Sequence, residues 1–433
     1  MTEVTYEGSL QARLPVRQSA RACVRACAQA AAELGARRAR LAEVPAVRVD
    51  DGAIATAFVS ERHLLINGRA PVNFAPLSRF WRTADGWVRT HTNYAHHRQR
   101  LLTVMGPPES LEAAFAERSS LEVEEAVYAA GGLAVALRTP EEWAAHEQAA
   151  ELAKRPLVEH ERLDSAPARV LTPLGTAPLL PAAGLRVLDL TRVVAGPVAT
   201  RTLALLGADV LRLDPPRLPE LPDQHADTGF GKRSATLDLV ADRRTFEELL
   251  AAADVVVTGY RPGALDRFGL SPRALAERRP GVVVAQLSAW GAYGPWRERR
   301  GFDSLVQVAT GIAVVEGSPE RPGALPAQAL DHGTGYLLAA AVLRALTEQS
   351  REGGSRVVRL ALARTAQWLM NEVPADAPGD AGEAYVDPRP WLAETDSGVG
   401  RLRYALSPVS FTGGPVDWAR PPGGWGTDPA RWG

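Results

Sequence analysis

Residues 184–214, GLRVLDLTRVVAGPVATRTLALLGADVLRLD, are the stretch that decides the fold. The run LRVLDL (185–190) is short and almost continuously apolar, as is typical of a parallel strand that is buried on both faces. GPVATRTLALLGA (196–208) has helical character, and DVLRLD (209–214) is a second apolar run. Strand, helix and strand in this order predict a βαβ unit with a right-handed crossover.

The same alternation continues downstream. TFEELLAAA (245–253) has the pattern of a helix, DVVVTG (254–259) of a strand, SPRALAERRP (271–280) of a helix and GVVVAQLS (281–288) of a fourth strand. Strands and helices that alternate at this rhythm build a parallel sheet covered by helices. The sequence therefore predicts an α/β protein with a Rossmann-like parallel sheet.

Bulk properties restrict the class of protein further. At 433 residues the chain exceeds one ordinary hydrophobic core, which predicts at least two domains. Its 49 basic and 50 acidic residues give a net charge of −1, so no overall field favours a nucleic acid or a membrane as partner. The N-terminal MTEVTYEGSL has no secretory signal pattern, and no run of about 18 apolar residues occurs. We therefore expect a cytoplasmic protein.

Cysteine is represented by Cys23 and Cys27 alone, four residues apart in a predicted helix. A tetrahedral metal site needs further ligands, and no His or Cys pair lies nearby in the sequence. We expect structural thiols, a reducing compartment and no metal site.

Whether the α/β part binds a nucleotide depends on its loops. Asp214 ends the second strand, as the ribose-binding acid of dinucleotide enzymes does, but TRVVAGP (191–197) lacks the G-x-G-x-x-G pattern. A dehydrogenase is therefore disfavoured, and the phosphate groups of a nucleotide-like ligand would have to be bound by other residues. Three basic clusters that enter or leave strands are candidates to converge on a polyanion, although surface Arg is common in so Arg-rich a chain: Lys232 with Arg233, Arg261 with Arg267, and Arg297, Arg299 and Arg300.

Several motifs together carry a resemblance to a known family. With residues 184–214, the motifs KRSATLDL, ADVVVTGYRPGALDRFGL, RRGFDSLVQVATG and LDHGTGYLLAAAVLRAL, over about residues 183–369, resemble the class III CoA-transferase family. That family also contains carnitine and formyl-CoA transferases and α-methylacyl-CoA racemases. The resemblance implies a CoA-binding Rossmann-like domain, an acyl-CoA and a small carboxylic acid as substrates, no tightly bound cofactor, and a homodimer.

The resemblance also implies that Asp331 is catalytic. In the transferases this carboxylate attacks the donor acyl-CoA and then carries CoA as an aspartyl-CoA thioester, a covalent relay open to a desolvated, aligned carboxylate. From the residues alone, an Asp at a predicted helix start is better explained as an N-cap. The motif DHGTG (331–335) offers backbone N–H groups that would stabilise an oxyanion.

The CoA contacts implied by the resemblance lie in the loops after the strands. They are Val194, Ala195, Leu237 (with 238–240), Arg261 (with 259–260), Arg267, Arg300 and Asp303 (with 301–302). This chain departs from the family at Pro215, where a basic residue is frequent and for which Arg217 is a substitute, and at Gly259-Tyr260, where Asn-Phe is usual. A glycine-run loop is also missing. These departures motivate an alternative, a catalytically degenerate CoA-binding or regulatory protein.

A second alternative is an acyl-CoA racemase. Racemases of the family pair the Asp with a His in a G-H-D motif, because an α-carbon needs a proton-transfer group on each face. Here the motif is Gly301-Phe302-Asp303, and Phe302 cannot transfer a proton. His332 follows Asp331 directly, but adjacent residues at a helix start point in different directions, so racemisation is disfavoured.

The order of the parts is unusual. NFAPLSRFWRTADGWVRTHTNYAHHRQRLLTVMG (73–106) and AAGGLAVALRTPEEW (129–143) resemble the small domain that normally follows the CoA-binding half. We expect a permuted chain, in which His96 and His97 are solvated. The predicted parts are a helical segment (1–45), a small α/β lobe (46–165), a Pro-rich linker (166–184), the CoA-binding domain (185–370) and an extended tail (371–433) that packs on the body or a partner subunit.

Overall fold

The computed structural model describes residues 10–175, 178–375 and 387–433. The N-terminal decapeptide considered above lies outside these ranges except for Leu10, and so do short parts of the predicted linker and tail. Among the described helices, none is long and apolar enough to cross a bilayer.

A seven-stranded sheet forms the main body, in the order β6-β12-β11-β10-β7-β8-β9. All neighbours are parallel except β6, which runs antiparallel to β12 at one edge. The strands are β6 (Glu159–Arg162), β7 (Arg186–Leu190), β8 (Asp209–Asp214), β9 (Lys232–Thr236), β10 (Val255–Thr258), β11 (Val283–Ser288) and β12 (Arg356–Ala361). The prediction of an α/β protein with a mostly parallel sheet is confirmed.

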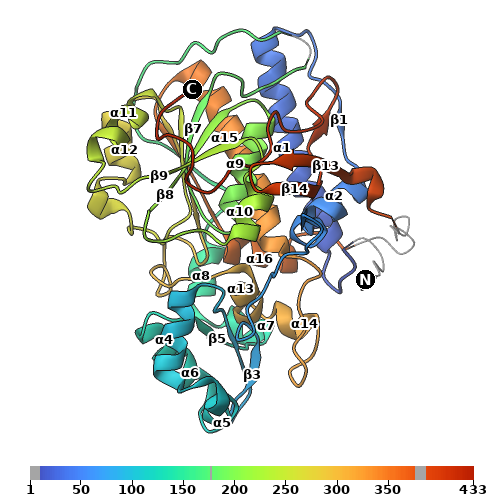
Figure 1. Ribbon diagram of the computed structural model, residues 1–433, viewed down its shortest axis with the longest axis vertical. Helices are drawn as coiled ribbons and strands as arrows, with labels where there is room; N and C mark the ends of the chain where they lie inside the picture. The colour runs from blue at the N-terminus through green and yellow to red at the C-terminus, as the bar shows by residue number, and fades with distance from the viewer. Residues whose placement is uncertain (1–9, 176–177, 376–386) are drawn as a thin grey trace.

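Helices cover both faces of this sheet, because successive strand residues point to opposite sides. Val187, Val255 and Val283 belong to the core under α1 (Val16–Ala39), α9 (Ala195–Leu205) and α15 (Ala329–Glu352). Leu188 and Val256 belong to the core under α11 (Arg243–Ala252) and α12 (Pro272–Arg278). The apolar runs of the sequence are continuous for this reason. Figure 1 shows α1, α9 and α15 on one side of the strands and α11 and α12 on the other.

Both cysteines lie in the core between α1 and its neighbours. Cys23 and Cys27 are fully buried and unbridged, and burial raises the pKa of each thiol to about 12. Among the described residues, no group of His, Cys, Asp and Glu has the arrangement of a metal site. The expectation of structural thiols agrees with this environment.

A smaller lobe lies beneath the main sheet in Figure 1 and has a core of its own. Trp81, Val88, Leu101, Phe115 and Val123 form its centre. Its elements are an antiparallel sheet of β3 (Phe80–Arg82), β4 (Trp87–Thr90) and β5 (Ala134–Ala136), with α4 (Ala95–Met105), η1 (Pro108–Ser110), α5 (Leu111–Ala116) and α6 (Ser120–Ala129). The chain returns through α7 (Pro140–Ala144) and α8 (Glu147–Ala153) to β6, which joins the main sheet.

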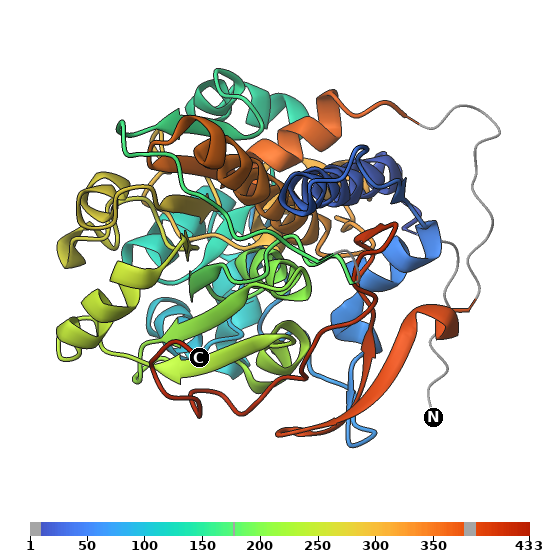
Figure 2. The same ribbon diagram turned by 90° about the horizontal axis from the view of Figure 1, so that it is seen from above.

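The N-terminal and C-terminal segments pair with each other. β1 (Val47–Arg48) pairs with β15 (Ser410–Phe411), and β2 (Leu65–Ile66) adds to the hairpin of β13 (Leu392–Ser397) and β14 (Gly400–Ala405). The indole N–H groups of Trp418, Trp425 and Trp432 donate to Arg201, Asp214 and Leu249 respectively. Figure 2 shows this last segment running along β8 and β9. The tail therefore packs on the body of its own chain.

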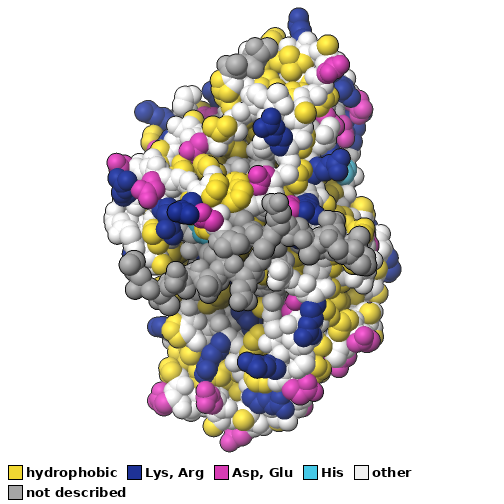
Figure 3. All heavy atoms as spheres, turned by 90° about the vertical axis from the view of Figure 1, so that its right-hand side faces the viewer, with side chains coloured by type: hydrophobic (Ala, Val, Ile, Leu, Met, Phe, Trp, Pro, Cys, Tyr) yellow, Lys and Arg dark blue, Asp and Glu magenta, His cyan; other side chains and the backbone are white. Residues whose placement is uncertain are grey.

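The remaining elements connect these units. They are α2 (Asp51–Phe58), α3 (Ser60–His63), α10 (Pro222–Thr228), η2 (Asp266–Phe268), α13 (Asp303–Ala309), α14 (Ile312–Val315), α16 (Leu362–Asn371) and η3 (Arg389–Trp391). The described part of the Pro-rich segment crosses the amino-terminal edge of the main sheet, where Arg169 forms an ion pair with Asp254 and the N–H of Gly354 donates to the carbonyl of Ala166. Basic and acidic side chains are interspersed over the face shown in Figure 3.

Candidate active site

Asp331 lies in the first turn of α15, where that helix meets the start of α9. The two helices approach closely because residue 335 is glycine: a Cβ there would lie 2.6 Å from the carbonyl oxygen of Ala195. Asp331 is almost fully buried, with 6% of its surface exposed. The carboxyl group is thus held on a rigid helix next to the turn that follows β7.

Asp303 holds the main chain of Asp331. The N–H of Asp331 donates to Oδ2 of Asp303 at 2.9 Å, and the Nε2 group of Gln307 donates to Oδ1 of the same carboxylate. The N-cap of α15 is Gln328, so the alternative interpretation of Asp331 as an N-cap is wrong. The expected free N–H groups are also partly occupied, because the N–H of His332 donates to the carbonyl of Gln328.

Three carboxyl groups influence one another around Asp331. Burial, and then the nearby Asp303 and Glu61, raise the pKa of Asp331 well above its ordinary value. Burial also raises the pKa of Asp303, to about 6. Glu61 belongs to α3, and its Oε2 lies 3.7 Å from Nε2 of His332. Burial opposes ionisation of Glu61, but His332 outweighs it and lowers the pKa of Glu61. Asp331 therefore keeps its proton to a higher pH than an ordinary aspartate.

His332 is directed toward the N-terminal segment. Its ring stacks on Phe58 of α2, with centroids 5.4 Å apart, and is fully buried. This agrees with the expectation that His332 and Asp331 point in different directions.

Phe302 lies under the small lobe. Its ring stacks on His91, with centroids 3.9 Å apart, and meets the edge of His97. Burial lowers the pKa of His91 to about 3. The prediction that His97 is solvated is wrong, because the inner face of α4 packs on Phe302 and leaves His97 only 4% exposed. His96, its neighbour, is half-buried.

The turn after β7 contains two of the predicted CoA contacts. Val194 is the N-cap of α9 and Ala195 its first residue. Val193, just before them, has a φ of +71°, which is strained for a β-branched residue and costs about 1–3 kcal/mol. Its N–H donates to Oε2 of Glu220 at 3.1 Å. Such strain is frequently found in ligand-binding turns.

Arg261 and Arg300 follow β10 and β11. Because β7, β10 and β11 are adjacent parallel strands, these residues and Val194 lie at one edge of the sheet. Arg267 lies in η2 with its guanidinium over the ring of Phe268 and is exposed, and Leu237 is buried just after β9, farther along the sheet. The predicted set is thus brought together only in part.

The third basic cluster lies elsewhere. Lys232 and Arg233 begin β9, and the beginning of a parallel strand lies at the edge opposite to the loops after β10 and β11. Each is paired with an acid: Lys232 with Asp189 at 3.0 Å and Arg233 with Asp209 at 2.7 Å. The prediction that all three clusters converge is therefore wrong.

Asp214 is also engaged. Its buried carboxylate accepts hydrogen bonds from Arg212 at 2.7 Å and from the indole of Trp425 at 3.0 Å. This explains why an acid ends β8 without the glycine pattern of a dinucleotide site.

The small lobe fixes the loop after β11. Arg299 pairs with the buried Glu124 at 2.8 Å, and the hydroxyl of Tyr128 donates to the carbonyl of Arg300 at 2.8 Å. Neither Glu124 nor Glu61 was expected in the site, since each reaches it from a segment more than 170 positions away in the chain and carries no local signal.

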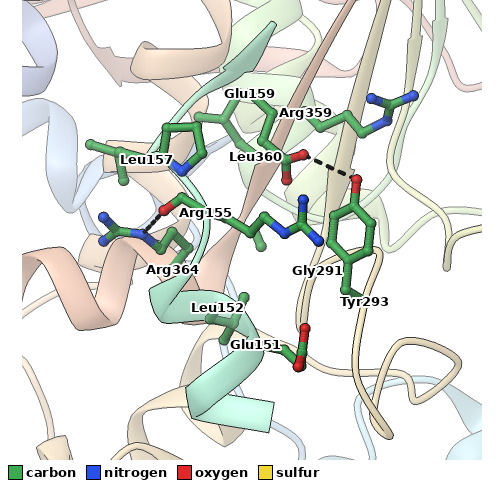
Figure 4. A pocket seen from close by; sticks show the side chains of 12 residues that line it. Glu151, Leu152, Arg155, Leu157, Glu159, Gly291, Tyr293, Arg359, Leu360 and Arg364 are labelled. Atoms are coloured by element: carbon green, nitrogen blue, oxygen red, sulfur yellow. Dashed lines mark hydrogen bonds between the residues drawn. The ribbon is translucent and has the colours of Figure 1, made fainter. Parts of the chain in front are cut away.

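Two concave places in the structure are not this site. The pocket in Figure 4 lies between Arg155, Tyr293 and Arg364, where the hydroxyl of Tyr293 bonds to Glu159. Its volume of about 10 Å³ is that of one water molecule. A groove of about 570 Å³ lies between the C-terminal ends of α1 and α15, whereas Asp331 is at the start of α15.

Most residues of the site fall in a segment that matches known proteins. Residues 182–397 match the family model described as CoA-transferase family III. The probable fatty acyl-CoA transferase Rv3272 of Mycobacterium tuberculosis is 36% identical over 208 residues, which cover 44% of this chain and 53% of that protein. The beta subunit of succinyl-CoA–L-malate CoA-transferase of Chloroflexus aurantiacus is 33% identical over 218 residues, which cover 46% of this chain and 54% of that protein. The chain spans about half the length of these relatives.

Solved structures give partial matches. The orthorhombic crystal structure of Rv3272 is 37% identical with a TM-score of 0.41, covering 43% of this chain and 54% of that one. A CAIB/BAIF family protein from Brucella suis is 25% identical with a TM-score of 0.40, covering 52% of this chain and 66% of that one. The segment of residues 182–397, which includes Asp331, is therefore similar to CoA-transferase family III.

Proposed function

We propose that this protein transfers CoA from an acyl-CoA to a small carboxylic acid through an aspartyl-CoA thioester on Asp331. The observation that carries the proposal is the position of Asp331: a nearly buried carboxyl group in the first turn of α15, not used as a cap, whose main chain is fixed by Asp303. The match of residues 182–397 to CoA-transferase family III supports CoA transfer in general.

The reaction needs one carboxylate and no net proton transfer. The Asp331 carboxylate attacks the thioester carbonyl, the C–S bond breaks, and an acyl-aspartyl anhydride and a CoA thiolate form. The thiolate attacks the aspartyl carbonyl and releases the donor acid, leaving aspartyl-CoA. The acceptor carboxylate then displaces CoA from Asp331, and the thiolate attacks the acceptor carbonyl of the new anhydride. Acceptor-CoA leaves and the Asp331 carboxylate is regenerated.

The environment of Asp331 suits this role. Burial and the neighbouring acids raise its pKa, and a carboxylate of higher pKa that is poorly solvated is a better nucleophile than an exposed one. Asp303 acts as a positioning residue, because its carboxylate is fully buried and bonded to the backbone of Asp331. In our proposal this positioning role replaces the role of CoA contact that the family resemblance implied for Asp303.

The loops after the strands supply the CoA-binding groups in this proposal. Val194 and Ala195 lie at the start of α9, where Ala195 approaches Gly335, one turn after Asp331 in α15. Arg261 and Arg300 lie at the same edge of the sheet. Arg267 and Leu237 lie farther out along the loops after β10 and β9 and complete the proposed set. As implied by the family resemblance, we also propose that the active form is a homodimer.

Trapping tests the covalent step. The protein is incubated with an acyl-CoA and either hydroxylamine or borohydride, and its peptides are analysed by mass spectrometry. We expect a modification on Asp331 and none on Asp303, and no turnover by Asp331→Asn. An unmodified Asp331 together with unchanged turnover by Asp331→Ala would exclude the covalent mechanism. CoA binding without turnover by the wild-type protein would favour the regulatory alternative.

A further inference from the structure

A cluster of cationic side chains crosses the boundary between the two lobes. Arg261 and Arg300 come from the loops after β10 and β11, and Arg100 and His96 come from α4 of the small lobe. After burial, the nearby Arg261 and Arg100 are the main causes that lower the pKa of Arg300. Arg100 and Arg300, after burial, likewise lower the pKa of His96. The contacts agree: the hydroxyl of Tyr128 donates to the carbonyl of Arg300, and Arg100 donates to the carbonyl of Gly131, whose own N–H donates to the carbonyl of Tyr128. The four side chains are all partly buried.

The positive charge of this cluster is not balanced. Over residues 10–175, 178–375 and 387–433, Arg100, Arg261 and Arg300 form no ion pair with a carboxylate, whereas Arg299 next to them pairs with Glu124. Arg261 donates to the carbonyl of Glu298 and Arg100 to the carbonyl of Gly131, which orients both groups without neutralising them. Like charges held together in this way favour an anionic ligand.

The cluster is held in place before any ligand arrives. The carbonyl of Arg300 accepts hydrogen bonds from the hydroxyl of Tyr128 at 2.8 Å and from the indole of Trp290 at 3.1 Å. Arg100 is anchored to Gly131, at the end of α6, by a 2.8 Å hydrogen bond. The cluster also lies at the carboxyl ends of the parallel strands, the edge at which open α/β sheets bind their ligands.

We propose that this cluster binds the phosphate groups of CoA, and that Arg100 and His96 of the small lobe are part of the CoA site of their own chain. The inference rests on the proposed function. Guanidinium groups match phosphate oxygens in geometry and remain charged when partly buried. CoA would then bridge the two lobes, with Arg261 and Arg300 on one side and Arg100 on the other.

Calorimetric binding of CoA to variants of α4 tests this assignment. Arg98, two positions before Arg100 on the same helix, is exposed and provides a matched control. We expect Arg100→Gln to weaken CoA binding about 10-fold or more, as for the loss of a charge-assisted hydrogen bond, and Arg98→Gln to change it less than about twofold. His96→Gln should weaken it by about threefold, as for a neutral hydrogen bond. Circular dichroism shows whether each variant is folded.

Two further ligands identify the phosphate. Pantetheine has none, so its affinity should be the same for the wild type and Arg100→Gln. If the loss caused by Arg100→Gln persists with dephospho-CoA, the cluster binds the pyrophosphate; if it disappears, the cluster binds the 3′-phosphate. Equal CoA affinities of folded Arg100→Gln and Arg98→Gln would overturn the inference even where Asp331 is trapped as expected. CoA binding that depends on Arg100 without modification of Asp331 would support the inference and refute the covalent function.

Discussion

Asp303 accepts a 2.9 Å hydrogen bond from the backbone N–H of Asp331, so one buried aspartate fixes the main chain of another. Asp303 begins α13 and Asp331 lies in the first turn of α15, and the contact ties the two helix starts together. The pKa of each carboxyl group is raised by burial, and the pKa of Asp331 also by the nearby Asp303. The pKa of Asp331 therefore depends on the charges of the acidic side chains around it.

Glu61→Gln should shift the pH dependence of turnover. Glu61 is one of the acids that raise the pKa of Asp331, so removing its charge lowers that pKa. The nucleophile must be ionised, and the acid limb of kcat/KM against pH should therefore move to lower pH. The measurement is the pH profile of CoA transfer.

Glu43→Gln is the control for this change, because Glu43 is an exposed acid in the same N-terminal region. An acid limb that does not move in Glu61→Gln would show that Glu61 does not act on Asp331. A fall in kcat at every pH without a shift would assign Glu61 a purely structural role.

Asp331→Asn should stabilise the protein, and more so at higher pH. The pKa of Asp331 is raised in the folded state, so its stability contribution is present below its unfolded pKa and is lost as the pH rises through its folded pKa. Asn has no such loss. We expect the variant to be more stable than the wild type at pH 8, with little difference near pH 4.

Urea unfolding at several pH values measures this difference. Asp266→Asn, at an exposed position in η2, is the control substitution. A difference between Asp331→Asn and the wild type that stays constant from pH 4 to 8 would contradict the raised pKa.

The sequence predicted the central strands well because each is buried on both faces. DVLRLD coincides with β8 (Asp209–Asp214), and LRVLDL differs from β7 by one residue. β6 was not predicted, since its sequence EHER has no apolar residue and it exists only through its pairing with β12. Local sequence contains no information on such long-range pairing.

The candidate site shows the same division. The sequence placed Asp331 at a helix start, which is a local feature, and the helix begins two residues before it. Its catalytic role was implied by the family resemblance and not by this local feature. The sequence did not predict three other residues of the site, because each approaches it from a distant segment of the chain: Glu61, Glu124 and His91. The predicted convergence of Lys232 with the other basic clusters was wrong. Lys232 begins β9, at the edge of the sheet opposite to the loops after β10 and β11.

Glu220→Ala should destabilise the protein strongly. The buried carboxylate of Glu220 accepts hydrogen bonds from Arg212 at 2.9 Å and from the hydroxyl of Tyr94, which belongs to the small lobe. Its removal leaves the buried Arg212 with one acid fewer and the N–H of Val193 without its acceptor. We expect a loss of about 3–5 kcal/mol in the free energy of unfolding.

Glu248→Ala is the matched control, because Glu248 pairs with Arg244 on the surface, where both side chains are largely exposed. An exposed pair of this kind contributes only about 0.3–0.5 kcal/mol. Similar losses for the two variants in denaturant unfolding would show that the Glu220 network is not a principal contact between the lobes.

Gly335→Ala tests whether the close contact of α15 with α9 positions Asp331. The added Cβ would lie 2.6 Å from the carbonyl oxygen of Ala195, a backbone atom that cannot rotate away, so α15 must shift. We expect a destabilisation of about 1–3 kcal/mol, as for overpacking, although alanine is otherwise favoured over glycine in a helix. Because Asp331 is one turn away, CoA transfer should fall at least about 10-fold.

Gly333→Ala provides the comparison within the same motif. Its Cβ would meet Sγ of Cys23 at 3.4 Å, an ordinary contact distance, so α15 can stay in place. This variant should keep its activity and gain up to about 1 kcal/mol from helix propensity. If Gly333→Ala and Gly335→Ala lose activity equally, the contact with Ala195 does not position the carboxyl group. If only Gly335→Ala loses it, while CoA still binds, the register of α15 against α9 is what places Asp331 for attack.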